Sequence, residues 1–136
     1  MNILILGGGG REHSLAWAVQ QNPKCDRLIV APGNAGIAQI AECADIDIND
    51  GDTVATFAAE NAVDFVIIGP EAPLAAGVAD RLRDAGFTVF GPSAAAAQLE
   101  ASKYFTKSVC DAANAPTARY ARFVQAAPAR AYVKEQ

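Results

Sequence analysis

A short apolar run meets four consecutive glycines near the start of the chain. Ile3–Leu6 is wholly apolar, which is typical of a central parallel strand buried on both faces. Gly7–Gly10 follow it, and the apolar spacing after them predicts a helix over 12–21, which Asn22–Pro23 ends. Unpaired N–H groups and the helix dipole at such a turn favour a negatively charged ligand, and glycines let it approach closely. The alternative is a tight turn that binds nothing.

The alternation of strand and helix continues to about residue 100. Apolar runs bounded by turn residues predict further strands over 27–31, 44–48, 64–68 and 87–90, and helices over 53–61, 74–85 and 94–100. Acidic residues alternate with apolar ones in the segment 44–48, which indicates an edge strand. Asp52 is the candidate cap of the helix that follows. The pattern predicts an α/β fold with a doubly wound, Rossmann-like parallel sheet.

Three glycine-rich or proline-rich loops follow strands of this sheet, at 7–10, 32–36 and 69–73. Ligands of such sheets bind at the carboxyl ends of the strands, so we expect the three loops on one rim. In the third loop Glu71 is flanked by prolines and is placed to accept ribose hydroxyls, unless it only complements a helix start. In the second loop Asn34 either lines the rim or holds its own turn.

Arg11, Glu12 and His13 occupy the first turn of the first predicted helix. Arg11 is a candidate partner for a phosphate or carboxylate, and Glu12 for a hydroxyl, and the alternative for both is a solvated helix turn. His13 is the single histidine of the chain. A lone histidine without a second ligand or a nucleophile favours a structural role, so we expect it half-buried and hydrogen-bonded to a neighbouring loop.

A dinucleotide ligand is disfavoured by the spacing of the glycines. The G-x-G-x-x-G motif needs glycine where Glu12 or His13 stands, and the second strand ("LIVAPGN") ends without an acidic residue for the ribose. The lysine and hydroxyl residue of a Walker A loop are also missing. NAD, FAD and P-loop nucleotide binding are therefore not expected, and neither is an NAD-dependent oxidoreductase.

Composition narrows the class of protein further. The 136 residues suffice for one domain and little more, and the net charge of −4 without a basic cluster gives no support to a nucleic-acid partner. No apolar stretch is long enough for a membrane partner or a signal peptide. Three widely spaced cysteines indicate reduced thiols, two or three of them buried, in a cytoplasmic protein.

The segment 102–136 differs from what precedes it. It predicts a helix over 102–113, a break at 114–117, a strand over 118–124 and a helix that begins at 127. The pattern ends on a charged helical sequence without a cap. We therefore expect a domain over 1–101 and the truncated start of a second domain over 102–136. Residues 114–136 are expected to be mobile or packed differently without their apolar partners.

Four segments together resemble one enzyme family. They are "GGGGREH" (7–13), "APGNAG" (31–36), "GPEAPL" (69–74) and "FGPSAAAAQLEASKYFTK" (90–107), in order over almost the whole chain. They resemble the phosphoribosylamine–glycine ligase family, also called glycinamide ribonucleotide synthetase, of the ATP-grasp superfamily. Ala101 departs from the pattern, because the family often has glycine there.

The resemblance implies an ATP-dependent carbon–nitrogen ligase of purine biosynthesis. Glycine is activated as an acyl phosphate, and the amine of 5-phosphoribosylamine displaces the phosphate. The resemblance also implies that the amino-terminal Rossmann-like domain, which precedes the ATP-grasp portion, takes the ribosyl half of the substrate. Carried over by position, Gly9, Gly10 and Arg11 line the substrate, Asn34 lies on the rim and Glu71 binds the ribose.

The family's chain is much longer, and its ATP-grasp lysines and magnesium ligands lie beyond residue 136. The resemblance therefore implies no catalytic residue and no metal ligand in this segment. ATP and Mg²⁺ (or Mn²⁺) serve the parent enzyme, neither is expected on this segment, and the segment alone is expected to be inactive. The basic residues that hold the 5′-phosphate also lie in the missing part. The alternative function is a non-catalytic module that binds a sugar phosphate or nucleotide.

Overall fold

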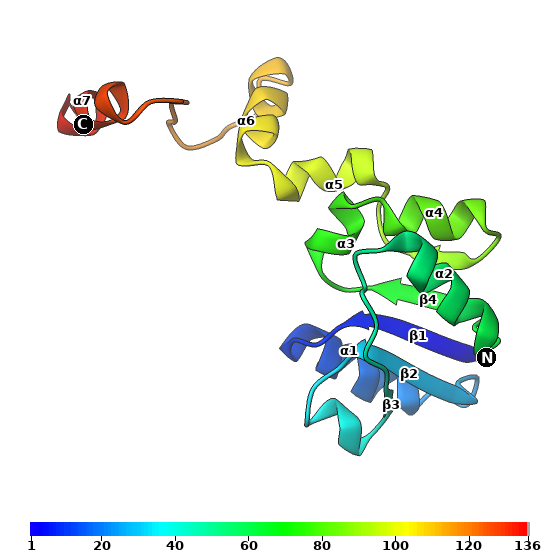
Figure 1. Ribbon diagram of the computed structural model, residues 1–136. Helices are drawn as coiled ribbons and strands as arrows, with labels where there is room; N and C mark the ends of the chain where they lie inside the picture. The colour runs from blue at the N-terminus through cyan, green and yellow to red at the C-terminus, as the bar shows by residue number, and fades with distance from the viewer. Residues whose placement is uncertain (136) are drawn as a thin grey trace. The chain divides into compact units, whose positions relative to one another are not determined.

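The computed structural model describes residues 1–135, and the chain divides into two compact units with the boundary between Ala101 and Ser102. The first unit is built on a five-stranded sheet with the order β3-β2-β1-β4-β5, in which every pair of neighbours is parallel (Figure 1). Its strands are β1 (Asn2–Gly7), β2 (Arg27–Pro32), β3 (Glu42–Cys43), β4 (Phe65–Ile68) and β5 (Thr88–Phe90). The strand order reverses between β1 and β4, so the predicted doubly wound sheet is confirmed.

Helices cover both faces of this sheet (Figure 1). They are α1 (Gly10–Gln20), the 3₁₀ turn η1 (Ile37–Gln39), α2 (Gly51–Glu60), α3 (Glu71–Ala75), α4 (Val78–Asp84) and α5 (Ala94–Ala101). Side chains alternate along each strand, so β1 contributes to two cores. Leu4 and Leu6 pack with α2, α3, α4 and α5, whereas Ile3 and Ile5 pack with α1 and η1.

The register of the strands aligns the loops that follow them. Leu6 is paired with Ala31 of β2 on one side and with Ile68 of β4 on the other. The strands β1, β2 and β4 therefore end at the same level, at the point where the strand order reverses. The loops after Gly7, Pro32 and Ile68 lie on one edge, as the sequence predicts.

Several element boundaries differ from the sequence-based prediction. The expected strand over 44–48 is wrong, because β3 is confined to Glu42–Cys43 and only the bond from Ala44 N to Val30 O (3.1 Å) extends the pairing. Ile46 and Ile48 instead pack against the core. The edge position is confirmed.

The helix expected over 74–85 is in fact two helices. Gly77 has a left-handed conformation (φ 86°) that separates α3 from α4, a backbone state that glycine adopts without steric cost. The cap of α2 is Asp50 rather than Asp52, since the Asp50 carboxylate accepts from Asp52 N (3.0 Å). The helix expected from Glu12 begins two residues earlier, at Gly10.

The second unit contains α6 (Lys103–Ala112) and α7 (Ala126–Glu135). The Ser102 side chain caps α6 by accepting from Phe105 N (3.2 Å). The strand expected over 118–124 is wrong, because this segment is irregular and is held by side chains. Lys107 Nζ donates to Thr117 Oγ1 (2.6 Å) and to Ala118 O (2.7 Å).

The cysteines also differ from expectation. All three are free thiols, but Cys25 and Cys110 are half-buried and Cys43 is exposed, so none is fully buried. Across residues 1–135, no helix is both long and apolar enough to cross a membrane.

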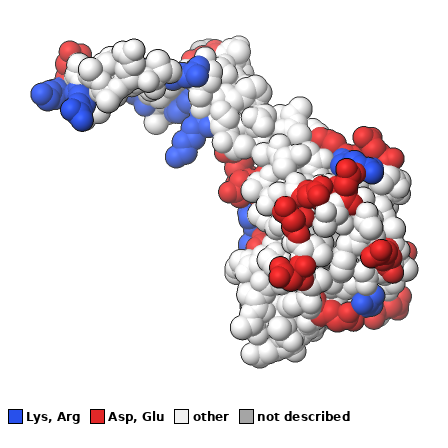
Figure 2. All heavy atoms as spheres, in the orientation of Figure 1, with Lys and Arg blue, Asp and Glu red and all other residues white. Residues whose placement is uncertain are grey.

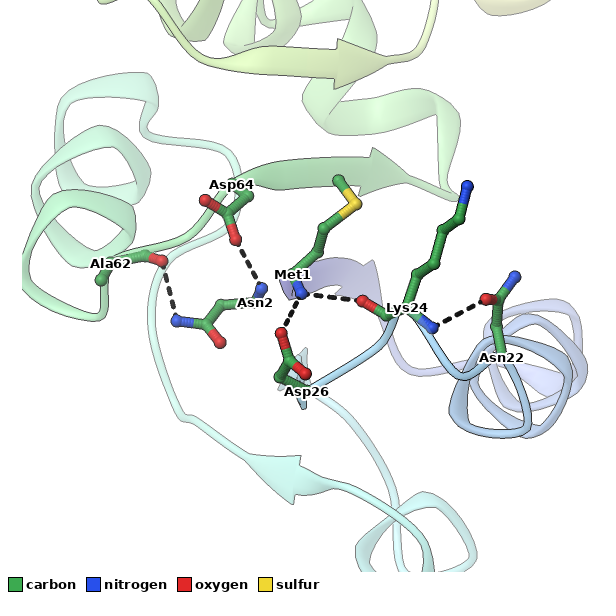
Figure 3. A network of polar contacts seen from close by, with 7 residues as sticks. All are labelled: Met1, Asn2, Asn22, Lys24, Asp26, Ala62 and Asp64. Carbon is green, nitrogen blue, oxygen red and sulfur yellow. Dashed lines mark hydrogen bonds and ion pairs between the residues drawn. The ribbon is translucent and has the colours of Figure 1, made fainter.

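A polar network fastens the amino ends of the strands, at the edge opposite the three loops (Figure 3). The Met1 ammonium donates to Lys24 O (2.7 Å) and pairs with the Asp26 carboxylate. Asn2 N donates to Asp64 Oδ2 (2.7 Å), and Asn2 Nδ2 donates to Ala62 O (2.9 Å). The start of β1 is thereby tied to the segments that lead into β2 and β4.

Candidate functional site

The glycines of the first loop make room mainly for other parts of the rim. Gly7 has φ 125°, and a Cβ there would lie 2.5 Å from Glu12 Cγ. A Cβ at Gly8 would lie 2.5 Å from the carbonyl oxygen of Gly33, and one at Gly9 would lie 2.9 Å from Glu12 Oε2. A Cβ at Gly10 would have no neighbour within 4 Å. Packing therefore explains three of the four glycines and leaves Gly10 facing open space.

Glu12 is buried inside the rim, with 4% of its surface exposed. One carboxylate oxygen accepts from Gly9 N (2.7 Å), which satisfies an N–H at the cap of α1. The expectation of a solvated first turn is therefore wrong for Glu12. Its carboxylate is also turned to the protein rather than to a ligand hydroxyl.

Arg11 extends from the first turn of α1 into solvent. Its Nε donates to Glu12 Oε1 (3.0 Å), while 59% of the side chain is exposed. That hydrogen bond and the Glu12 charge raise the pKa of the Arg11 guanidinium, and Glu100 and Glu71 add smaller contributions. Among the described residues only Nε is engaged, so both Nη groups are available to a ligand.

Asn34 connects the second loop to the first. Its Nδ2 donates to Gly8 O (2.8 Å), while its Oδ1 accepts from Gly36 N (2.8 Å) and Ile37 N (2.9 Å). The interpretation that Asn34 holds its own turn is thus supported, because both ends of the amide are used within the rim. A contact between Asn34 and a ligand stays a prediction.

Glu71 is the first residue of α3 and is exposed. Within residues 1–135 its carboxylate forms no hydrogen bond or ion pair. Its charge makes a small contribution to the raised pKa of Arg11. The position leaves Glu71 available as an acceptor, and a helix N-terminus also favours an acidic residue there.

His13 packs against the second loop. It is half-buried as expected, and a Cβ at Gly36 would lie 2.7 Å from its Cε1 atom. The expected hydrogen bond to that loop is wrong, since the imidazole has no hydrogen-bond partner within the described part of the chain. The imidazole ring packs against Gly36 and not against a polar group.

A groove of about 610 Å³ lies beside the carboxyl ends of β4 and β5. Arg11 and Glu100 are its charged residues. Its other lining residues are apolar or glycine: Leu15, Ile67, Ile68, Gly69, Leu74, Val89, Phe90, Gly91 and Pro92. A mainly apolar groove with a few polar groups at one end suits a small organic ligand that carries polar substituents.

Among residues 1–135, Arg11 is the one basic residue that lines this groove, and Arg83 donates to the carbonyl oxygen of Gly91 at its edge. Arg11 is the single Lys or Arg in the segments 7–13, 31–36, 69–74 and 90–93. In the view of Figure 2, acidic side chains are spread over the visible face of the first unit, with few basic ones among them. Residues 1–135 contain no group of three or more His, Cys, Asp and Glu side chains arranged to hold a metal ion.

The fold belongs to the Rossmann-like α/β class, and the candidate site lies where the strand order reverses, the place at which such sheets bind their ligands. Comparison with known families is more specific. The family model described as phosphoribosylglycinamide synthetase, N domain, matches residues 1–100. The chain belongs to this family.

Relatives with high sequence identity are considerably longer than this chain. The chain is 55% identical over 136 residues to a phosphoribosylamine–glycine ligase of Agrobacterium fabrum, and 52% identical over 138 residues to one of Pseudomonas aeruginosa. Each match covers 100% of this chain and 32% of the relative. The chain therefore spans about a third of the length of these relatives.

Solved structures agree in fold. A phosphoribosylamine–glycine ligase from Thermotoga maritima matches with a TM-score of 0.71 and 24% identity, over 99% of this chain and 30% of that one. The biotin carboxylase domain of a single-chain bacterial carboxylase matches with a TM-score of 0.66 and 13% identity, over 99% of this chain and 34% of that one. At these identities the likeness concerns the fold alone.

Proposed function

We propose that this chain is the amino-terminal domain of an ATP-dependent ligase that joins glycine to 5-phosphoribosylamine, giving glycinamide ribonucleotide in purine biosynthesis. The rim of the first unit binds the phosphoribosylamine. Membership of the family and relatives named phosphoribosylamine–glycine ligase support this proposal. The observation that carries it is the family match over residues 1–100. Gly10, the one glycine of the first loop that packing does not require, leaves room for a ligand to approach the backbone.

Different residues of the rim then contact different parts of the ligand. Backbone N–H groups of Gly10 and Arg11, at the first turn of α1, lack partners within the helix and face the ligand. The Nη groups of Arg11 donate to its oxygen atoms. Glu71 accepts from ribose hydroxyls, and the groove beside β4 and β5 receives the sugar ring.

The 5′-phosphate requires more positive charge than this rim offers. Arg11 is its single cation in the rim segments, and a phosphate dianion is usually held by several donors. We infer that the main phosphate-binding residues lie in the remaining two-thirds of the parent enzyme. Gly9 and Asn34 position the loop rather than hold the charge.

The described residues do not fit the ATP and magnesium of the parent reaction. No cluster of side chains suited to a metal ion occurs among residues 1–135. Glycine activation belongs to the rest of the parent, and residues from Ser102 onward begin that portion. We expect the segment alone to be inactive as a ligase.

A chimeric enzyme tests this function. The corresponding third of the Agrobacterium ligase is replaced with this chain, whose 55% identity spans all 136 residues. We expect the chimera to form glycinamide ribonucleotide from phosphoribosylamine generated in situ, glycine and ATP. A folded chimera without this activity, together with binding of ribose 5-phosphate by the 136-residue chain, would instead favour a non-catalytic sugar-phosphate module.

A further inference from the structure

Glu12 is the one charged side chain that is buried among the described residues. A buried carboxylate is costly unless every part of it is satisfied, so its partners indicate what it does. Oε2 accepts from Gly9 N (2.7 Å), and Oε1 accepts from Arg11 Nε (3.0 Å). The two oxygens thus fix two separate groups of the first loop, one on the backbone and one on the guanidinium.

Glu12 also fills the space between the first and third loops. A Cβ at Gly69 would lie 2.2 Å from Glu12 Oε1, and one at Gly7 would lie 2.5 Å from Glu12 Cγ. Gly69 does not have a left-handed φ, so its backbone tolerates a side chain. The neighbour that excludes a side chain at Gly69 is therefore Glu12 itself.

An ordinary helix cap accounts for only part of this arrangement. The reciprocal half of a capping box is the bond from Gly9 N to the Glu12 carboxylate. Such a cap needs neither a guanidinium partner nor a glycine on a loop that is 57 residues away in the sequence. Both are present, and both belong to the rim that faces the ligand.

We propose that Glu12 is the positioning residue of this site: its carboxylate aims Arg11 and holds the Gly9–Gly10 backbone against the third loop. Glu12 does not touch the ligand. It acts through Arg11 and through the N–H groups at the start of α1. The inference rests on the proposed function for the identity of the ligand, but the contacts of Glu12 do not depend on that identity.

A double-mutant cycle on the 136-residue chain tests the contact between the loops. Gly69→Ala places a methyl group against Glu12 and lowers the melting temperature, as does Glu12→Ala. In the Glu12→Ala background the clash is gone, so Gly69→Ala then has little effect. Gly10→Ala is the matched glycine control and leaves the melting temperature nearly unchanged, because nothing lies near its Cβ. Additive effects of Glu12→Ala and Gly69→Ala would overturn the proposed contact.

Solvent exchange of individual protons tests the hydrogen bonds that Glu12 accepts from Arg11 and Gly9. In Glu12→Gln the side chain keeps its size and one acceptor oxygen but loses its charge. We expect NMR to show faster solvent exchange of the Arg11 Nε–H than in the unaltered chain, with a smaller change at the Gly9 amide. Unchanged exchange at both positions would overturn the proposal whatever the chimera does.

Kinetics of the chimera test the positioning role. Glu12→Gln is expected to raise the KM for phosphoribosylamine about tenfold, the effect of weakening one charged hydrogen bond. The kcat and the KM values for glycine and ATP stay within about twofold, since only the oriented donors of the rim change. Glu60→Gln, an exposed carboxylate on α2 outside the groove, is the control and leaves all constants unchanged.

The outcomes separate this proposal from the proposed function. A chimera with an intact rim that does not use phosphoribosylamine refutes the function, while the cycle and the proton exchange still decide the role of Glu12. An active chimera in which Glu12→Gln lowers stability without changing the KM for phosphoribosylamine refutes the positioning role alone.

Discussion

The Asn34 side chain donates from Nδ2 to the carbonyl oxygen of Gly8, at 2.8 Å, across a separation of 26 residues. The same amide accepts from Gly36 N and Ile37 N through its Oδ1 atom. One side chain thus holds the second loop in shape and fastens it to the glycine loop. Three hydrogen bonds of one side chain therefore constrain this part of the rim.

Two substitutions separate the contributions that the Nδ2 and Oδ1 atoms of Asn34 make to stability. Asn34→Ala removes all three hydrogen bonds and is expected to lower the free energy of unfolding by about 1–3 kcal/mol. Asn34→Asp keeps the acceptor for Gly36 N and Ile37 N but sets a carboxylate against Gly8 O. Urea unfolding of the two variants measures both parts, and an Asn34→Ala variant as stable as the parent would show that the loops do not need this link.

Gly8 and Gly10 differ in what lies beside them, so their alanine variants behave differently. Gly8→Ala places a methyl group 2.5 Å from the backbone oxygen of Gly33 and is expected to cost about 1–3 kcal/mol of stability. Gly10→Ala meets no neighbour, and it keeps or slightly raises the stability of the chain because alanine favours helices.

Gly10→Ala, which keeps the stability of the chain, is expected to impair the binding of phosphoribosylamine. In the chimera, Gly10→Ala leaves a stable protein with a raised KM for phosphoribosylamine, since the methyl group occupies the space in front of the first turn. Thermal unfolding and steady-state kinetics on one preparation check both effects. A Gly10→Ala chimera with an unchanged KM would mean that the ligand does not approach this backbone.

The ammonium group of Met1 makes stability depend on pH above neutrality. Its hydrogen bond to Asp26 raises its pKa above the ordinary value of 8.0. The folded chain therefore binds the proton of this group more tightly than the unfolded chain does. The contribution of the ammonium to the free energy of unfolding is fully present below about pH 8 and is lost as the pH rises through the folded pKa. We expect urea unfolding to show that the free energy of unfolding falls as the pH is raised above about 8.

Asp26→Asn isolates that contribution from other groups that titrate in the same range. The difference in unfolding free energy between the parent and Asp26→Asn should shrink as the pH rises. A difference that is constant across the range would show that the Met1–Asp26 pair is not formed in solution.

Residues 114–135 are expected to exchange their amide hydrogens rapidly in the 136-residue chain. Helix α7 contributes no buried residue, Val124 and Val133 are 87% and 73% exposed, and the segment 115–123 has no regular structure. Such segments open at little cost in free energy. Hydrogen exchange read by mass spectrometry checks this, and strong protection over 118–135 would contradict it.

The sheet and its rim could be predicted from the sequence because the patterns that indicate them lie within short segments. Apolar runs such as Ile3–Leu6, each followed by glycine or proline, predict parallel strands and the edge where their loops meet. The strand expected over 44–48 failed because its alternation reflects side chains that pack on the core without a pairing partner. The strand expected over 118–124 failed because the segment has no pairing partner among residues 1–135, and Lys107 donates to the backbone oxygen of Ala118.

The role of Glu12 was hidden because it depends on a distant residue. In the sequence Glu12 looks like a solvated residue of a first helical turn, and Gly69 looks like a simple turn glycine. Their meaning emerges only when β4 places Gly69 beside α1.

Glu71→Gln in the chimera tests whether this rim binds the ribosyl half of the substrate. Hydrogen bonds to charged groups are worth about 1.5–3 kcal/mol, so the KM for phosphoribosylamine should rise by roughly one to two orders of magnitude. The KM values for glycine and ATP should stay nearly unchanged, and so should the melting temperature, because Glu71 is exposed and makes no hydrogen bond within residues 1–135. A large fall in melting temperature with an unchanged KM for phosphoribosylamine would contradict the claim and leave Glu71 as a helix-start residue.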